Sequence, residues 1–441
     1  MSFARVDRLL AADRWREALD ALDDLETRAP GPLAPVTSAE ASARRLAALR
    51  HLGDLETAAD LARAVIVRAR AAGWMHVLQT ALRERALCLV ELGDAPAAVR
   101  LAEEAADLAE TAGDLAGLGL AFLAIGDARA RWIGPGQAVD SWQAAADTLR
   151  VAGTGEPTKS ASNAPLSIPL TRLGEQAHRE GRLEEARALL DEALAHARGA
   201  PLAEAGARWS LAMLLEEQAR RGASGEPGTS PAAARIELER ALALFRQVGQ
   251  RRGVARALNA LGEHARRAGR LAEADQRYTE ALAQVPASDP FAEAYRLNRA
   301  LVALAAGDTA AALKGAAGHE QATDPSWAAV AASVRLAAGS TITGARSWDA
   351  AERAVRHAIE VRGVVDRDLA DCLVRAAADS DADRAARAAD LALGQLLLRG
   401  SDDELQAIRR RLRLLGGAGA AIPLGPDRKS TRLNSSHTVI S

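Results

Sequence analysis

A repeated pattern of large, small and turn-forming residues is the strongest constraint on how this chain can fold. The clearest copy runs from Ala255 to Pro286 and reads as a helix, a turn at Gly269, a second helix and a stop. In the second helix Ala274, Tyr278 and Ala281 are about one helical turn apart, so they share one face. The segment therefore predicts two antiparallel helices that bury this face against their neighbours.

The same pattern recurs through the N-terminal part of the chain. The turn glycines Gly53 and Gly93 are 40 residues apart, and Ala58, Ala98 and Ala138 keep that spacing on the second helices. Further along, residues 170–194 and 258–282 are identical at 14 of 25 aligned positions. Two generic amphipathic helices would not agree so closely, so we interpret the chain as a product of internal duplication.

The order of leucine and glycine, turn glycine, alanine, aromatic residue, alanine and proline in residues 255–286 resembles the tetratricopeptide repeat family, here in a bacterial protein. This resemblance implies an all-α fold, a right-handed α-solenoid of antiparallel helical hairpins. Composition agrees, because the apolar residues are mostly Ala, Leu and Val and only 3% of residues are aromatic. The family's unit is about 34 residues long, so the longer period requires either longer helices or longer turns.

Composition divides the chain into segments with different expectations. We expect N-terminal repeats at 1–150, a loop or linker at 151–169, central repeats at 170–326, divergent repeats or capping helices at 327–415, and a disordered tail at 416–441. A cap is expected because a solenoid must cover its last apolar face. Residues 427–441 break from the preceding composition and resemble translated read-through of a sequencing adapter, so we expect them to be non-native.

Charge and motif content point away from several classes of function. The 56 basic and 58 acidic residues nearly cancel, giving a net charge of -2 and no overall field that would attract nucleic acid or an anionic membrane. The N-terminus has no signal-peptide core and the longest apolar run, near 115–126, is too short to span a bilayer, so we expect a cytoplasmic protein. The sequence contains no phosphate-binding loop, no HExxH motif and no His/Cys cluster, so we expect no catalytic residue, metal or cofactor. Cys88 and Cys372 are expected to be free buried thiols.

The family resemblance also implies where a partner would bind, because first helices line the concave face of a tetratricopeptide array. Transferring the family's peptide-contacting positions selects residues in three hairpins. They are Thr171, Glu175, His178 and Arg179 in the unit starting near Ser167, Trp209 and Met213 in the unit starting at Ala205, and Arg256, Asn259, Glu263, Arg266 and Arg267 in the unit starting at Ala255.

Arginine binds carboxylates through two hydrogen bonds and tryptophan offers a large apolar anchor, so these positions favour an acidic peptide. The chain has only three lysines, which argues against the lysine-based peptide clamp best known in the family. The competing interpretation is that the polar residues are ordinary solvated surface and that Trp209 belongs to the core.

Two functional hypotheses follow from the sequence. The first is a non-enzymatic scaffold that presents a concave helical groove to a protein or peptide. The alternative is the sensory or regulatory region of a larger signalling protein, such as a transcription regulator or a repeat-linked protease, whose effector domain lies outside this chain. The sequence leaves the identity of the partner and the oligomeric state open.

Overall fold

A computed structural model describes residues 3–29, 31–153, 164–220, 230–287, 289–319 and 325–339, together with Asp349, Arg353 and Cys372. The tail at 416–441 and nearly all of the predicted C-terminal segment beyond residue 339 lie outside the described residues. The chain divides into two compact units, Met1–Ala257 and Leu258–Ser441. We describe each unit by itself.

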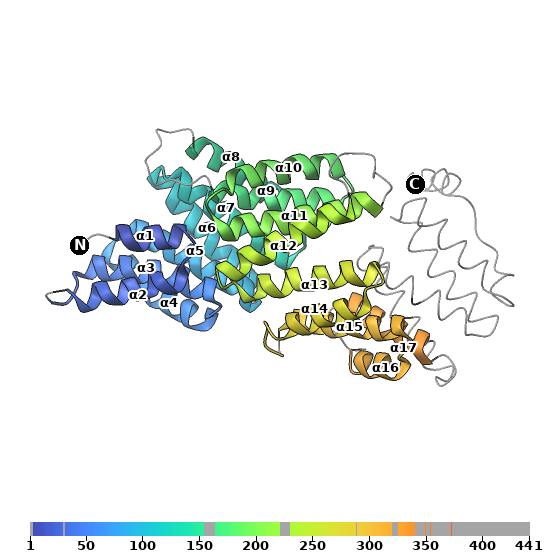
Figure 1. The fold of residues 1–441 in the computed structure, drawn as a ribbon. Helices are drawn as coiled ribbons and strands as arrows, with labels where there is room; N and C mark the ends of the chain where they lie inside the picture. Colours follow the sequence, from blue (N-terminus) through green and yellow to red (C-terminus); the bar gives the residue numbers. More distant parts are fainter. Residues whose placement is uncertain are drawn as a thin grey trace, which may run out of the picture. The chain divides into compact units, whose positions relative to one another are not determined.

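Every regular element in the described residues is a helix (Figure 1). The first unit contains α1 (Ala4–Ala11), α2 (Trp15–Thr27), α3 (Pro35–Leu52), α4 (Leu55–Ala72), α5 (Met75–Leu92), α6 (Ala95–Ala112), α7 (Leu115–Trp132), the 3-10 turn η1 (Pro135–Ala138), α8 (Val139–Gly153), α9 (Ala164–Arg179), α10 (Leu183–His196), α11 (Pro201–Arg220) and α12 (Pro231–Gln247). Helix α13 (Arg251–Arg267) crosses the boundary between the units, and α14 (Leu271–Leu282), α15 (Pro290–Ala306), α16 (Thr309–Ala316) and α17 (Pro325–Gly339) follow.

The stretch 151–169, predicted as a loop or linker, is helical at both ends. Helix α8 continues to Gly153, and α9 begins at Ala164 and contains Pro169. Residues 154–163, in the middle of the predicted linker, lie outside the described part of the chain.

The 40-residue period comes from long helices. Each helix from α3 to α7 is 18 residues long. Gly53, Gly73, Gly93 and Gly113 follow the first four of them with φ between 67° and 93°, a left-handed conformation that ends a helix at low cost only for glycine. One helix and its two-residue turn thus occupy 20 residues, and the turns stay short.

Three hairpins are closed by a glycine on the first helix that faces a large residue on the second, 16 residues later. The pairs are Gly126 and Trp142, Gly174 and Leu190, and Gly262 and Tyr278. A Cβ atom added at Gly126 would lie 2.4 Å from Cδ1 of Trp142, far inside van der Waals contact. The α3–α4 hairpin reverses the sizes, with buried Leu46 on the first helix and buried Ala62 on the second.

The predicted second-helix positions are buried as expected. Ala274, Tyr278 and Ala281 are each 0% exposed, and the equivalent Ala98 and Ala138 are also 0% exposed. These residues form the apolar contacts between hairpins, so the predicted all-α architecture of stacked antiparallel helical hairpins is confirmed.

Within Met1–Ala257 the first helices of successive hairpins pack against one another. Helix α3 contacts α5, α5 contacts α7, and α9 contacts α11, whereas each second helix packs chiefly between first helices. We refer to α3, α5, α7, α9, α11 and residues 251–257 of α13 as the first-helix layer. Because these first helices lie closer to one another than successive second helices do, the first-helix layer forms the inner side of the hairpin stack.

The substitution Gly126→Ala tests the closure of the hairpins. The new Cβ must displace the buried Trp142 indole, so we expect the free energy of unfolding to fall by about 1–3 kcal/mol. Gly206→Ala in α11 is the matched control, because an added Cβ there meets nothing within 4 Å. The control should leave stability unchanged or raise it by up to about 1 kcal/mol through helix propensity. Chemical denaturation followed by circular dichroism measures both, and equal losses would contradict the interpretation.

Candidate functional site in the first-helix layer

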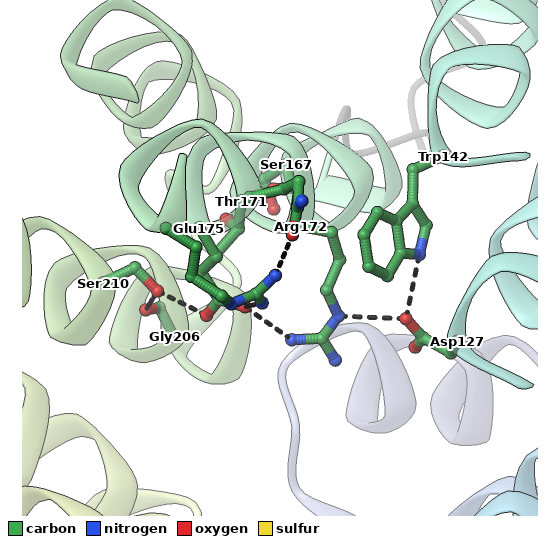
Figure 2. A network of polar contacts seen from close by, with 10 residues as sticks. Asp127, Trp142, Ser167, Thr171, Arg172, Glu175, Gly206 and Ser210 are labelled. Carbon is green, nitrogen blue, oxygen red and sulfur yellow. Dashed lines mark hydrogen bonds and ion pairs between the residues drawn. The ribbon is translucent and has the colours of Figure 1, made fainter. Parts of the chain in front are cut away.

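The arginine at the centre of Figure 2, Arg172, joins two first helices. Its Nε atom donates to Oδ1 of Asp127 on α7 at 3.0 Å, and the same oxygen accepts from Nε1 of Trp142 at 3.1 Å. Its Nη1 atom lies 3.6 Å from Oε2 of Glu175 on its own helix. The charge of Asp127, with that of Glu175, raises the pKa of Arg172 further above its ordinary value despite burial, so Arg172 is a permanent cation.

Glu175, one of the residues selected from the sequence, is a carboxylate saturated by donors. Ser210 on α11 donates its Oγ hydroxyl to Oε1 at 2.7 Å, and Nη2 of Arg179 lies 3.9 Å from Oε2. Burial alone would raise the pKa of Glu175, but the charges of Arg172, Arg256 and Arg179 and the Ser210 hydrogen bond outweigh it and hold this pKa below its usual value. Glu175 is therefore an ionised structural acceptor and a poor proton donor.

Trp209 and Arg256 form a stacked pair between α11 and α13. The guanidinium carbon of Arg256 lies 4.0 Å from the centroid of the indole ring, within the range of a cation–π interaction. The Nε1 atom of Trp209 is buried without a hydrogen-bond partner, while the residue as a whole is half-buried. Trp209 is thus only partly covered, and its indole N–H has no acceptor among the described residues.

The structure therefore brings four of the sequence-selected residues into one cluster in the first unit. Glu175, Arg179, Trp209 and Arg256 are linked by hydrogen bonds, ion pairs, electrostatic attraction or stacking. We call these four residues, with Asp127, Arg172 and Ser210, the polar cluster. Half-buried His178 and Met213 lie on the same helices, α9 and α11, and Thr171 is buried on α9.

The other selected residues lie in the second unit. Asn259 donates its Nδ2 to Oε1 of Glu263 at 2.9 Å, and Asn298 on α15 donates its Nδ2 to Oδ1 of Asn259 at 2.8 Å. Arg267, which is exposed, forms an ion pair with Glu263 at 3.4 Å, and Arg266 is half-buried on the same helix. Asn259 and Glu263 thus join α13 to α15.

Three acidic residues repeat one interaction between neighbouring first helices. Each directly follows the glycine that packs on the second helix and accepts a hydrogen bond from the next first helix. The pairs are Asp127 with Arg172, Glu175 with Ser210, and Glu263 with Asn298. Sequence analysis missed the importance of Asp127, Arg172 and Ser210. The available signal was the acidic residue repeated after each of these glycines.

A second buried ion pair stabilises the start of the first-helix layer. Arg50 Nε donates to Oε2 of Glu84 at 2.9 Å, Arg83 Nη2 donates to Oε1 at 3.2 Å, and Glu84 is only 4% exposed. Burial opposes ionisation, but the charges of Arg50 and Arg83 overcome it and lower the pKa of Glu84 to about 2. His51 stacks on Trp15 at 4.0 Å, and burial, aided by the charge of Arg50, lowers its pKa well below the ordinary value.

Cys88 and Cys372 are buried and do not form a disulfide, and burial raises the pKa of Cys88 to about 12. In the part of the chain that the structure describes, no group of three or more His, Cys, Asp or Glu side chains is placed to hold a metal ion. None of the described helices combines the length and the apolar character needed to cross a membrane.

No protein-family model matches this chain, and no curated protein matches it. Solved structures resemble it at low similarity. BtubC (BKLC) from P. vanneervenii is 19% identical with a TM-score of 0.39, covering 49% of this chain and 86% of that one. PilF from Pseudomonas aeruginosa is 22% identical with a TM-score of 0.33, covering 55% and 96%. Aspartyl phosphate phosphatase F from Bacillus subtilis is 11% identical with a TM-score of 0.43, covering 97% and 98%.

The repeated hairpins, with their glycine and large-residue pairs, decide the architecture. The described residues form a tetratricopeptide-like helical-repeat protein. The geometry of the hairpins supports this assignment, and the similarities to solved structures assign no function to the chain.

The substitution Glu84→Gln tests the buried ion pair. It leaves Arg50 and Arg83 without their carboxylate, and a pKa lowered from 4.5 to about 2 corresponds to a loss of about 3 kcal/mol of unfolding free energy at pH 7. Because the folded pKa lies below the unfolded one, this stabilisation is present above pH 4.5 and disappears as the pH falls through 4.5 towards 2. Urea unfolding at several pH values should show the difference between wild type and variant narrowing over that range.

Glu104→Gln is the control for this measurement, because Glu104 pairs with Arg70 on the surface and is 40% exposed. Exposed pairs contribute less than about 1 kcal/mol, so the control should be close to wild type at every pH. A Glu84→Gln difference that stayed constant down to pH 2 would contradict the assignment.

Proposed function

We propose that this chain is a non-enzymatic scaffold that binds a protein or peptide on its first-helix layer, centred on Trp209 and Arg256. The observation that carries the proposal is the stacked pair itself. An indole that is only partly covered, with its flat face held by a guanidinium group 4.0 Å away, resembles the aromatic and arginine anchors that dominate protein interfaces. The unused Trp209 N–H supports it further, because a buried donor without an acceptor is costly and a partner oxygen would relieve that cost.

Charge around the pair favours an acidic partner. Arg172, Arg179 and Arg256 contribute three positive charges to the polar cluster, whereas Asp127 and Glu175 contribute two negative charges. Guanidinium groups bind carboxylates through paired, charge-assisted hydrogen bonds, so an incoming carboxylate is the kind of group that these arginines suit. An acidic peptide with an apolar residue for the indole fits this arrangement best.

The proposal places the protein in the bacterial cytoplasm, where buried thiols such as those of Cys88 and Cys372 remain reduced. The proposal requires no chemical step of the layer, and the lowered pKa of Glu175 makes that carboxylate a poor proton donor.

Partner capture followed by mutation tests the proposal. The partner is identified by pull-down and mass spectrometry from the native organism, purified, and titrated against variants. Trp209→Ala should weaken binding about 10- to 100-fold, because the central anchor of an interface is lost. Trp209→Phe keeps an apolar ring but removes the N–H donor, so it should fall between wild type and Trp209→Ala. Variants of Trp209 are easier to interpret than variants of Asn259, because the Asn259 side chain also joins α13 to α15.

Trp132→Ala is the matched control for loss of a tryptophan. Trp132 is 54% exposed at the end of α7, outside the polar cluster, and its replacement should leave the dissociation constant unchanged. Full binding by a folded Trp209→Ala variant would disprove the assignment of the binding face.

A further inference from the structure

A hydrogen bond connects two parts of the first unit that are 189 residues apart in sequence. Asp13, in the turn between α1 and α2, accepts at Oδ2 from the backbone N–H of Leu202, at the start of α11, over 2.7 Å. Asp13 is only 8% exposed. The first hairpin of the chain therefore contacts the hairpin that carries Trp209.

The contact provides a hydrogen-bond acceptor for a backbone N–H group in the first turn of α11. The N–H groups in the first turn of a helix have no acceptor within the helix, and residue 200, just before α11, is an alanine with no oxygen in its side chain. Asp13 supplies the missing acceptor from another hairpin, as an N-cap residue would within its own chain segment. A negative charge is also favourable at this end of a helix.

Asp13 occupies its position against two opposing effects. Its φ is 56°, a left-handed conformation that is unfavourable for a residue with a Cβ atom. Burial raises the pKa of its carboxyl group, and the hydrogen bond from Leu202 only partly offsets this. Local backbone hydrogen bonds from the Asp13 and Arg14 N–H groups to Leu10 and Leu9 hold the turn itself, and the contact with α11 supplies a hydrogen bond to the buried carboxylate.

A second long-range contact lies beside the first-helix layer. Arg252 Nη1 of α13 forms an ion pair with Oε2 of Glu91 on α5 at 3.0 Å. The two side chains are 44% and 36% exposed, so the pair contributes little by itself. Together with Asp13, it shows that the end of the first unit folds back onto its beginning.

Several polar side chains of the first-helix layer are buried. Gln79, Glu84, Thr171, Gln176 and Ser210 are each 7% exposed or less. Trp209 and Met213 are only half-exposed to solvent. A partner that bound along this layer would need more of it uncovered.

We propose that the α1–α2 turn is an autoinhibitory latch, in which Asp13 holds the start of α11 and keeps the first-helix layer closed until a partner releases it. The role of the layer as a binding face rests on the proposed function above, whereas the latch itself is a property of the fold. Opening separates Asp13 from Leu202 and exposes the side of α11 that carries Trp209 and Met213.

Two substitutions of Asp13 separate the latch from the turn. Asp13→Gly accepts the left-handed backbone without strain but removes the acceptor. Asp13→Asn tolerates the same backbone and keeps a side-chain oxygen for the Leu202 N–H. Hydrogen exchange of the Leu202 amide should accelerate about tenfold or more in Asp13→Gly, because loss of the hydrogen bond shifts the closed state towards the open one. Asp13→Asn should exchange close to the wild-type rate.

A cysteine placed at Met213 reports access to the layer without any partner. Its rate of alkylation by N-ethylmaleimide should rise about tenfold in the Asp13→Gly background and stay near the reference rate in Asp13→Asn. The native thiols are buried, and Cys88, with its pKa of about 12, reacts slowly. Val67→Cys on α4 is the control, because Val67 is 63% exposed and should react at one rate in all backgrounds. Circular dichroism verifies that each variant is folded.

Unchanged alkylation at position 213 in a folded Asp13→Gly protein would overturn the latch, even with faster exchange at Leu202, because Asp13 would then be a helix cap alone. The outcomes for the binding face are separate. Faster alkylation without loss of partner binding in Trp209→Ala would support the latch and remove the proposed function. Unchanged alkylation at position 213 in Asp13→Gly, together with partner binding that Trp209→Ala abolishes, would support the proposed function and remove the latch.

Discussion

In three hairpins a large second-helix side chain rests directly on a glycine of the first helix. Trp142 over Gly126 and Tyr278 over Gly262 leave no room for even a single extra carbon atom. Where the first helix carries Leu46, the second helix carries Ala62 in return. The large and small residues thus exchange sides, and close packing of the two helices is kept in both arrangements. This contact sets how near the two helices lie, and therefore how each hairpin meets the next.

The polar contacts between hairpins follow from the same packing. A residue that directly follows the packed glycine lies about 100° further around the helix, which turns it from the second helix towards the neighbouring first helix. At this position Asp127, Glu175 and Glu263 accept hydrogen bonds from the next hairpin. These bonds are directional, so they specify the register between hairpins that apolar contacts alone would leave adjustable. Side chains at this position therefore join neighbouring hairpins.

More of the fold than of the candidate site could be predicted from the sequence. The spacing of Ala274, Tyr278 and Ala281 predicted burial correctly, since helical periodicity is local. The choice of long helices over long turns was open, because glycines at 20-residue intervals acquire their meaning only once their backbone angles are known. Arg172 and Ser210 were missed because their partners are 45 and 35 residues away. Such pairs become neighbours only when complete hairpins stack.

The amino-acid sequence by itself determined the helical hairpin, its period and the faces that hairpins bury, because these depend on residues within one or two turns of each other. Only the tertiary structure decided that Asp13 meets Leu202, 189 residues away, and that Trp209 stacks beneath Arg256. The physical reason is that small rotations between successive hairpins accumulate along the array. The sum of those rotations decides which distant hairpins come into contact, and this sum cannot be read from any local sequence pattern.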